Sequence, residues 1–350
     1  MQKRLLYLLL LISFGCVQPY EVELEEGPQI LTVDGTITSG AGPHRIFLSK
    51  SATYGSIFEG LVRPVSGATV IARDELGNMV FFSEKSENRG EYQAPDSFFA
   101  VIGRSYTLQI QLSDGKVYTS FPEKVTQPPA IKKLSYKSVT TPVEGEINNA
   151  SGVQLIVDID DPGEENNFYY WRNAQATYVL ETRPDLFVNK ETRDPAPKDC
   201  CSICYTSELV GNQSIFIATD DNFNGLSTKI PVAYIPDDGV RFIQTYRIDL
   251  RQLSISSEAY RFLRLVKQQS ETSGSIFDPP PASIRGNMIS LDDPNEVVLG
   301  YFIAAGETSR RVYIKGAELD FRQNRGIIPD DCREVYDSVV NPPADWNPEE

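Results

Sequence analysis

The sequence is poor in histidine, and this scarcity limits the catalytic chemistries open to the chain. His44 is the only histidine among 350 residues. A serine–histidine–acid triad would have to use it, although it follows Gly42-Pro43 in a turn-like segment and no Gly-x-Ser-x-Gly sequence is present. Metal sites built on several histidines are excluded by count. We find no recognisable catalytic set and expect a protein that is not an enzyme.

Long apolar runs are also missing, because the longest is Leu5–Ile12, far below the roughly 20 residues of a membrane-spanning helix. Lys3 and Arg4 precede this run and Gly15-Cys16 follows it, which is the pattern of a secretory signal peptide over residues 1–15. Signal peptidase II requires a small residue before a cysteine, so we predict lipidation at Cys16 and an acidic, lipidated tether over residues 16–28. Phe14 departs from the usual lipobox, and an ordinary secreted protein is the alternative.

Basic residues are outnumbered, with 33 Lys and Arg against 48 Asp and Glu, for a net charge of −15. Such a surface repels nucleic acid and anionic lipid headgroups, so we expect no nucleic-acid partner. Trp and Met are few, whereas the chain has 17 Tyr, 17 Phe, 24 Gly and 23 Pro. This composition favours a β-rich exported protein with many turns.

The sequence of the first half of the chain predicts short strands separated by turns. The alternation over Tyr106–Leu112 followed by a turn at Asp114-Gly115 predicts a hairpin with one buried face. About seven such strands predict an immunoglobulin-like β-sandwich over residues 29–121. Three prolines within 122–129 break the pattern, so we predict a linker over residues 122–133.

The second half predicts a larger β-rich domain over residues 134–325 and a C-terminal tail over 326–350. It contains one clear amphipathic helix, which Ser256 can cap and Gly274 can end. Its apolar stripe consists of Ala259, Phe262, Leu263 and Val266. The expected fold class is therefore mainly β, with a sandwich followed by a β-rich domain that carries one helix.

The chain has four cysteines besides Cys16, namely Cys200, Cys201, Cys204 and Cys332. An even number in an exported chain predicts two disulfides. Adjacent cysteines rarely pair with each other, because neighbouring positions strain disulfide geometry. We therefore expect at least one bridge to reach Cys332 and to tie the tail to the long loop that contains Cys200. A zinc site is the alternative, since Cys201 and Cys204 have ligand spacing.

Two acidic segments are candidate calcium sites. Asp220, Asn222 and Asn224, followed by Gly225, match the start of an EF-hand loop, but Pro231 stands where its bidentate glutamate should be. A second acidic cluster consists of Asp158, Asp160, Asp161, Glu164 and Glu165. Asx turns formed without metal are the alternative for both segments. We expect no other cofactor.

An aromatic run, Tyr169-Tyr170-Trp171, is the candidate ligand-binding feature. Alternate rings face opposite sides of a strand, so half should enter the core while the rest could stack on a ligand. Gly286-Asn287, after three prolines, predicts a fixed turn with a structural role.

The chain resembles a family of Bacteroidota lipoproteins classed as domain of unknown function 4249. The matching segments are Val33-Asp34-Gly35 with Gly42-Pro43-His44, Pro64–Val70, Val157–Pro162, Ser256–Tyr260, Phe277–Asn287 and Val298–Phe302. The family has no established activity. The resemblance implies an outer-membrane lipoprotein with an immunoglobulin-like N-terminal region that accompanies a TonB-dependent receptor.

The expected function is thus a non-enzymatic binding or accessory module for nutrient uptake, anchored in the outer membrane by its lipid and exposed at the cell surface. A position on the periplasmic face is the alternative location. A glycan-acting hydrolase and a structural or adhesive surface protein are the alternative functions. The sequence does not identify the ligand.

Overall fold

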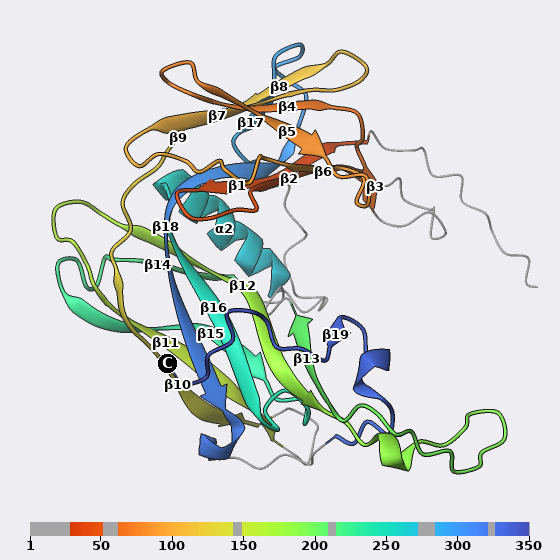
Figure 1. Cartoon of the computed structure of the whole chain (residues 1–350). Helices are drawn as coiled ribbons and strands as arrows, with labels where there is room; N and C mark the ends of the chain where they lie inside the picture. The colour runs from red at the N-terminus through yellow and green to blue at the C-terminus, as the bar shows by residue number, and fades with distance from the viewer. Residues whose placement is uncertain are drawn as a thin grey trace, which may run out of the picture.

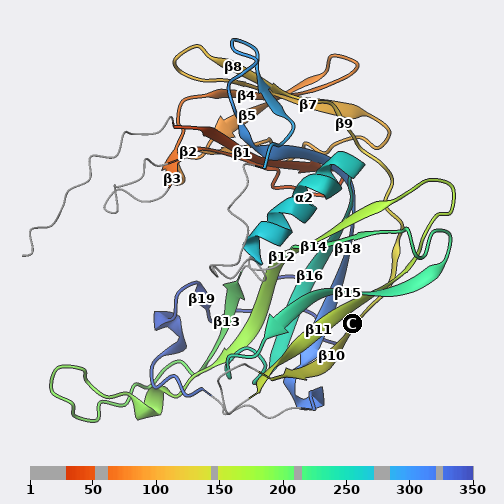
Figure 2. The same cartoon turned by 180° about the vertical axis from the view of Figure 1, so that it is seen from behind.

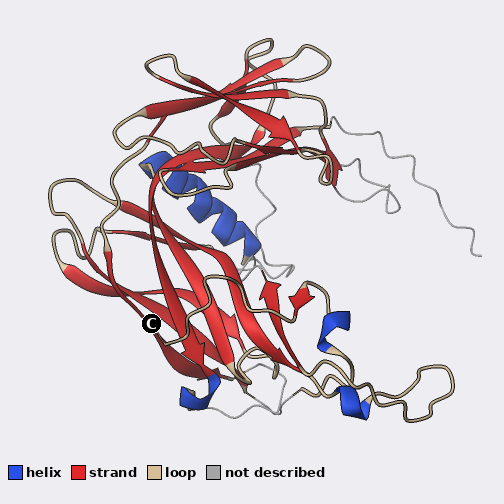
Figure 3. Cartoon of the chain, in the orientation of Figure 1, coloured by secondary structure: helices blue, strands red, loops and turns tan. Residues whose placement is uncertain are grey.

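The structure, a computed structural model, describes residues 29–51, 62–142, 149–208, 215–271, 284–320 and 326–349. These residues form a mainly β protein with one α-helix, which confirms the expected fold class (Figure 3). No helix in this described part of the chain has the length and apolar character needed to cross a membrane.

The N-terminal strands stack as two layers that form the upper part of the molecule in Figure 1. These strands are β1 (Leu31–Thr38), β2 (Arg45–Ser51), β3 (Val62–Pro64), β4 (Thr69–Asp74), β5 (Met79–Glu84), β6 (Glu91–Gln93), β7 (Ser105–Gln111), β8 (Val117–Ser120) and β9 (Glu123–Lys124). Burial alternates along β7, where Tyr106, Leu108 and Ile110 face the core as their spacing predicts.

In the larger body, a large sheet with long and short strands packs against a three-stranded sheet (Figure 2). The small sheet contains β10 (Ile131–Thr141), β11 (Ala150–Asp160) and β15 (Ser227–Pro236). The large sheet contains β12 (Phe168–Glu181), β13 (Ile203–Glu208), β14 (Phe216–Thr219), β16 (Thr245–Ser254), β18 (Leu299–Lys315) and β19 (Ser338–Val339). Val153, Leu155 and Val157 of β11 lie fully buried in the core between the two sheets.

Strand β18 belongs to both bodies. Its first part runs parallel to β1, from Thr32 opposite Leu299 to Thr38 opposite Ala305. Its second part runs antiparallel to β16, from Gly306 onward. In Figure 1 this blue strand passes from the sandwich into the larger body. A single strand therefore joins the two hydrophobic cores.

Some strands pair with partners from the other side of the expected domain boundary. β17 (Met288–Ser290) pairs with β8, and it places Met288 in the sandwich core together with Phe302 of β18. The expected linker over residues 122–133 contributes β9, which pairs with β7, and the start of β10. Two late strands thus complete the early sheets, since β18 pairs with β1 and β17 with β8.

The helix α2 (Ser257–Ser270) lies between the two bodies (Figures 1 and 2). The Ser256 hydroxyl accepts a hydrogen bond from the Ala259 N–H at 3.1 Å, so the predicted cap is confirmed. Ala259 and Leu263 are buried in a third apolar cluster with residues of β16 and β18. The helix ends at Ser270, and the predicted stop at Gly274 lies outside the described residues.

Candidate functional site

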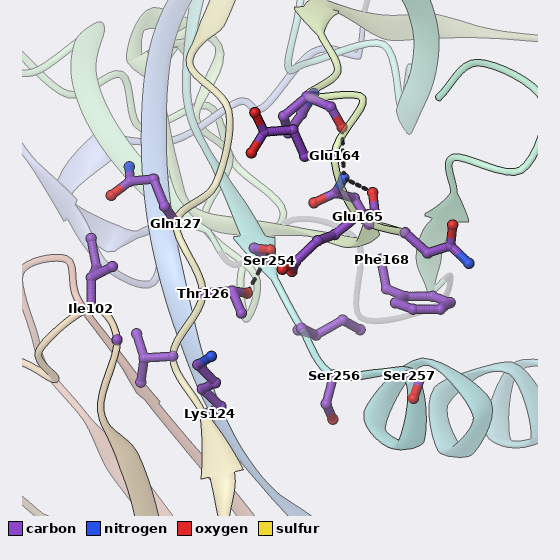
Figure 4. A pocket seen from close by; sticks show the side chains of 16 residues that line it. Ile102, Lys124, Thr126, Gln127, Glu164, Glu165, Phe168, Ser254, Ser256 and Ser257 are labelled. Carbon is purple, nitrogen blue, oxygen red and sulfur yellow. Dashed lines mark hydrogen bonds between the residues drawn. The ribbon is translucent and has the colours of Figure 1, made fainter. Parts of the chain in front are cut away.

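A cleft of about 530 Å³ lies at the seam between the sandwich and the larger body (Figure 4). Lys124 and Gln127 line one side, and Glu164, Glu165 and Phe168 line the other. Ser256 and Ser257, at the start of helix α2, form the floor. The walls are braced across the seam, because the hydroxyls of Thr126 and Ser254 are hydrogen bonded at 2.9 Å. The cleft offers charged, amide and hydroxyl groups and one aromatic ring to a ligand.

A second cleft of about 350 Å³ borders the first at Ser256 and contains a buried acid, Glu123. Glu123 accepts hydrogen bonds from Tyr301 at 2.5 Å, from Ser256 at 2.7 Å and from Asn287 at 3.3 Å. These donors belong to β18, the cap of α2 and the segment before β17. One carboxyl group therefore connects three elements that the chain supplies far apart.

Asn287 holds this joint in place through its side-chain amide. The amide oxygen accepts from the Phe302 N–H at 2.9 Å, and the amide nitrogen donates to the Phe302 carbonyl at 2.8 Å. Gly286 beside it has no room for a side chain, since a Cβ there would lie 1.4 Å from the Gly300 carbonyl oxygen. The fixed turn predicted at Gly286-Asn287 is thus a close contact with β18.

Burial raises the pKa of Glu123, while the hydrogen bonds from Tyr301, Ser256 and Asn287 oppose the rise. A carboxyl whose pKa is raised in the folded state favours folding fully below its unfolded pKa, and this contribution is lost as pH rises through the folded pKa. A raised pKa is also typical of a catalytic acid, but here all the recorded partners of the carboxyl belong to the joint.

We expect Glu123→Gln to flatten the pH dependence of stability above about pH 4.5, the ordinary pKa of a glutamate. Glutamine keeps an acceptor for Tyr301 but cannot ionise. Urea unfolding across this pH range measures the effect. Glu123→Ala should lose about 2–3 kcal/mol at low pH, where the three donors lose a fully contributing acceptor, and less as pH rises. Parallel pH profiles for the wild type and Glu123→Gln would contradict the assignment.

The aromatic run is divided between the two faces of β12 as predicted. Tyr169 and Trp171 are buried in the core of the larger body, and Trp171 donates to the buried Gln252 side chain at 2.9 Å. Tyr170 faces the other side, with the guanidinium of Arg172 5.9 Å from its ring. None of the three lines the two clefts described above. Phe168, at the start of the same strand, is the aromatic residue that lines the first cleft, and its sequence position did not distinguish it from its neighbours.

The cysteines pair as Cys204–Cys332, with an S–S distance of 2.03 Å, and as Cys200–Cys201. The first bridge includes Cys332, as expected, and ties the tail to the start of β13, directly after the loop. The expectation that adjacent cysteines do not pair with each other is wrong in this structure. Cys200, Cys201 and Asp331 are the only metal-ligand group of three found among the described residues, and two of its members share a disulfide.

His44 is buried beside the turn that precedes β2. Its Nδ1 accepts from the Thr38 N–H at 3.3 Å, and its ring packs edge-on against Phe98 at 5.4 Å. Burial lowers its pKa. These contacts place His44 at a turn, the position that the sequence favoured for it. Cys16, the predicted lipidation site, lies outside the described residues.

The candidate calcium residues separate into two groups. Asp220 is fully buried, whereas Asn222 and Asn224 are exposed. Asp161, from the second acidic cluster, lies against the same loop because its carboxylate accepts from the Gly225 N–H at 3.0 Å. The structure therefore joins two segments that the sequence presented as separate candidates.

Three of the segments that carry the family resemblance meet at the seam, namely 256–260, 284–287 and 298–302. The fold defines a class of mainly β proteins in which one long strand connects a sandwich to a larger two-sheet body. The chain belongs to the family described as domain of unknown function (DUF4249), whose model matches residues 17–311. This match confirms the resemblance. No curated protein and no solved structure matches the chain.

Proposed function

We propose that the mature protein is a lipid-anchored binding module of the outer membrane, which presents a nutrient to a partner membrane protein such as a TonB-dependent receptor. The observation that carries the proposal is the seam cleft, because its walls come from both bodies and are fixed by the Thr126–Ser254 hydrogen bond. Preformed clefts with a few placed polar groups are typical ligand sites. The sequence pattern around Cys16 supports the anchor.

The partner-binding surface in this proposal is the loop over residues 183–202, together with the tail that the Cys204–Cys332 bridge ties to it. This loop projects from the larger body on the side opposite the sandwich (Figure 1). It exposes Leu186 and Val188, and the tail beside it exposes Tyr336 almost completely, at 93%. Exposed apolar side chains on a rigidly tied loop are suited to protein contacts.

We expect wild-type cells to incorporate a palmitate analogue into the protein and a Cys16→Ala variant not to do so. Thioether formation requires the cysteine sulfur, and loss of the acyl chains should release the variant from the membrane fraction. Labelling followed by fractionation measures both effects. The lipoprotein assignment would be abandoned if the wild type stayed unlabelled or if the variant remained equally membrane-bound.

The binding role is tested by crosslinking the lipidated protein in native membranes and identifying what it captures. We expect a TonB-dependent receptor with the wild type and reduced capture after Leu186→Asp with Val188→Asp. The control is Leu76→Asp, which changes a leucine on the sandwich that is even more exposed, at 68% against 44% for Leu186. Glycosidase and peptidase assays run in parallel, and turnover that a single carboxylate substitution abolishes would contradict the proposal, as would failure to capture any partner.

A further inference from the structure

Two acidic loops of the larger body lie against each other at the edge of the seam cleft. The first runs from Asp161 to Asn167 and the second from Asp220 to Leu226. Backbone and side-chain bonds join them, since the Asp161 N–H donates to the Leu226 carbonyl at 3.1 Å and the Gly225 N–H donates to the Asp161 carboxylate at 3.0 Å. Carboxylates from distant parts of the chain are thereby brought into one small region.

Both carboxylates are removed from solvent, and one of them is incompletely bonded. Asp220 is 0% exposed and Asp161 is 6% exposed. One oxygen of Asp220 accepts from the Asn167 N–H at 2.7 Å, but the other, Oδ1, is buried without any hydrogen-bond partner. The hydroxyl of the preceding residue, Thr219, is also buried without a partner. Burial of an oxygen that has no hydrogen-bond partner costs free energy. A bound ligand would satisfy these two oxygens.

The two buried carboxylates are not neutralised by a cationic side chain of the part of the chain that the structure describes. Among the described residues, neither Asp161 nor Asp220 forms an ion pair, and Lys132 pairs with the neighbouring Asp160 instead. The Tyr169 hydroxyl donates to Asp161. The Tyr169 ring also stacks on Phe223, whose N–H donates to the Asp220 carbonyl at 2.7 Å, so this one tyrosine contacts both loops.

We propose that Asp161 and Asp220 hold a divalent cation of the calcium type between the two loops. The available ligand atoms are all oxygens, which hard cations prefer, and the irregular backbone of two loops suits the variable coordination of Ca²⁺ better than the strict octahedron of Mg²⁺. Asn222 and Asn224 lie at the exposed rim of the second loop, where their amide oxygens and water can complete the shell.

The cation would also stabilise one wall of the seam cleft. Asn167 connects the proposed cation site to the cleft wall. Its backbone N–H donates to Asp220. Its side-chain nitrogen donates to the Glu165 carbonyl at 2.8 Å and to the Pro162 carbonyl at 3.2 Å. The segment from Pro162 to Phe168 lines the cleft. The cation site itself stands on the buried carboxylates and does not depend on the proposed uptake function.

Terbium luminescence tests the site directly. Tb³⁺ replaces Ca²⁺ at oxygen sites and emits when a nearby aromatic ring is excited. Tyr169 hydrogen bonds to Asp161 and stacks on Phe223 of the second loop, with ring centroids 6.4 Å apart, and Trp171 lies 5.8 Å from Tyr169. We expect EDTA-treated full mature protein in detergent to show saturable emission with one ion per chain, which Ca²⁺ displaces.

Asp220→Asn should weaken terbium binding by roughly 10-fold or more, since even the loss of an outer-shell partner has an effect of that size. The matched control is Asp221→Asn, which removes the adjacent but exposed carboxylate and should leave binding unchanged. Circular dichroism verifies that the variants are folded, and Asp161→Asn replaces Asp220→Asn if that variant is not.

Terbium titration of the wild-type protein, without any variant, is enough to contradict the proposal. Folded protein that gives no saturable emission, or emission that Ca²⁺ does not displace, would show that the carboxylates hold no such cation. Equal loss of emission in the Asp220→Asn and Asp221→Asn variants would show binding to the acidic surface instead, and would overturn it as well. A melting temperature that rises with Ca²⁺ in the wild type and not in Asp220→Asn would support it independently.

Discussion

Gly300→Ala is expected to destabilise the protein by more than about 4 kcal/mol. Gly300 has φ +87° and lies in the parallel pair of β1 and β18, opposite Val33. A Cβ atom there would lie 1.9 Å from the Val33 carbonyl oxygen, so the two strands would have to separate. Urea unfolding followed by tryptophan fluorescence and circular dichroism measures the loss, and low expression is the expected outcome in cells.

The control variant is Gly103→Ala, which separates the steric effect from the backbone effect. Gly103 has nearly the same φ, +88°, but its surroundings leave open space for a Cβ atom. Its replacement should therefore cost only about 1 kcal/mol, the usual backbone penalty. Similar losses for the two variants would show that close packing between β1 and β18 contributes little.

Removal of the Cys204–Cys332 bridge by Cys332→Ser is expected to cost about 4–5 kcal/mol in the chain-entropy model. The bridge joins residues 128 positions apart and therefore restricts the unfolded chain strongly. It also holds a tail whose Trp346 contacts the rings of Tyr205 and Tyr313 at 5.2 and 5.4 Å. Unfolding midpoints of the oxidised wild type and the variant provide the measurement.

Cys200→Ser is the matched control, because Cys200 is exposed and its bridge to Cys201 closes almost no loop. Its stability should stay within about 0.5 kcal/mol of the wild type, as for most surface substitutions. A large loss in Cys200→Ser, with little change in Cys332→Ser, would reverse the roles given to the two bridges.

Local signals predicted the helix and the alternation along strands, because both depend on residues close together in the chain. Ser256 caps α2 where its side chain and the apolar stripe after it require. Strand β18 is an element that local sequence signals do not predict correctly. Its sequence predicts two strands, since polar residues over 307–311 follow the apolar stretch 301–305. Those polar residues lie where the strand leaves one hydrophobic core and enters another, so the polarity changes while the backbone continues.

The site residues were predictable only in part for the same physical reason. Alternation along a strand was enough to place Tyr169 and Trp171 in the core. Nothing near Glu123 in the sequence shows that it is buried, because its burial depends on Tyr301 and Asn287 from far along the chain. The contact between the loops of Asp161 and Asp220 is likewise a tertiary feature, although the sequence singled out both loops for their acidity.

Strand β18 also determines the order in which the molecule can be completed. Synthesis of the chain starts at its N-terminus, so β1 is available long before residues 299–305 can pair with it. Until then the sandwich has an open edge, and an open strand edge is a template for intermolecular pairing. Closure over such a sequence distance is slow compared with local folding. A chain cut before Leu299 would therefore be an aggregation-prone fragment, and correct folding of the N-terminal sandwich depends on a strand close to the other end of the chain.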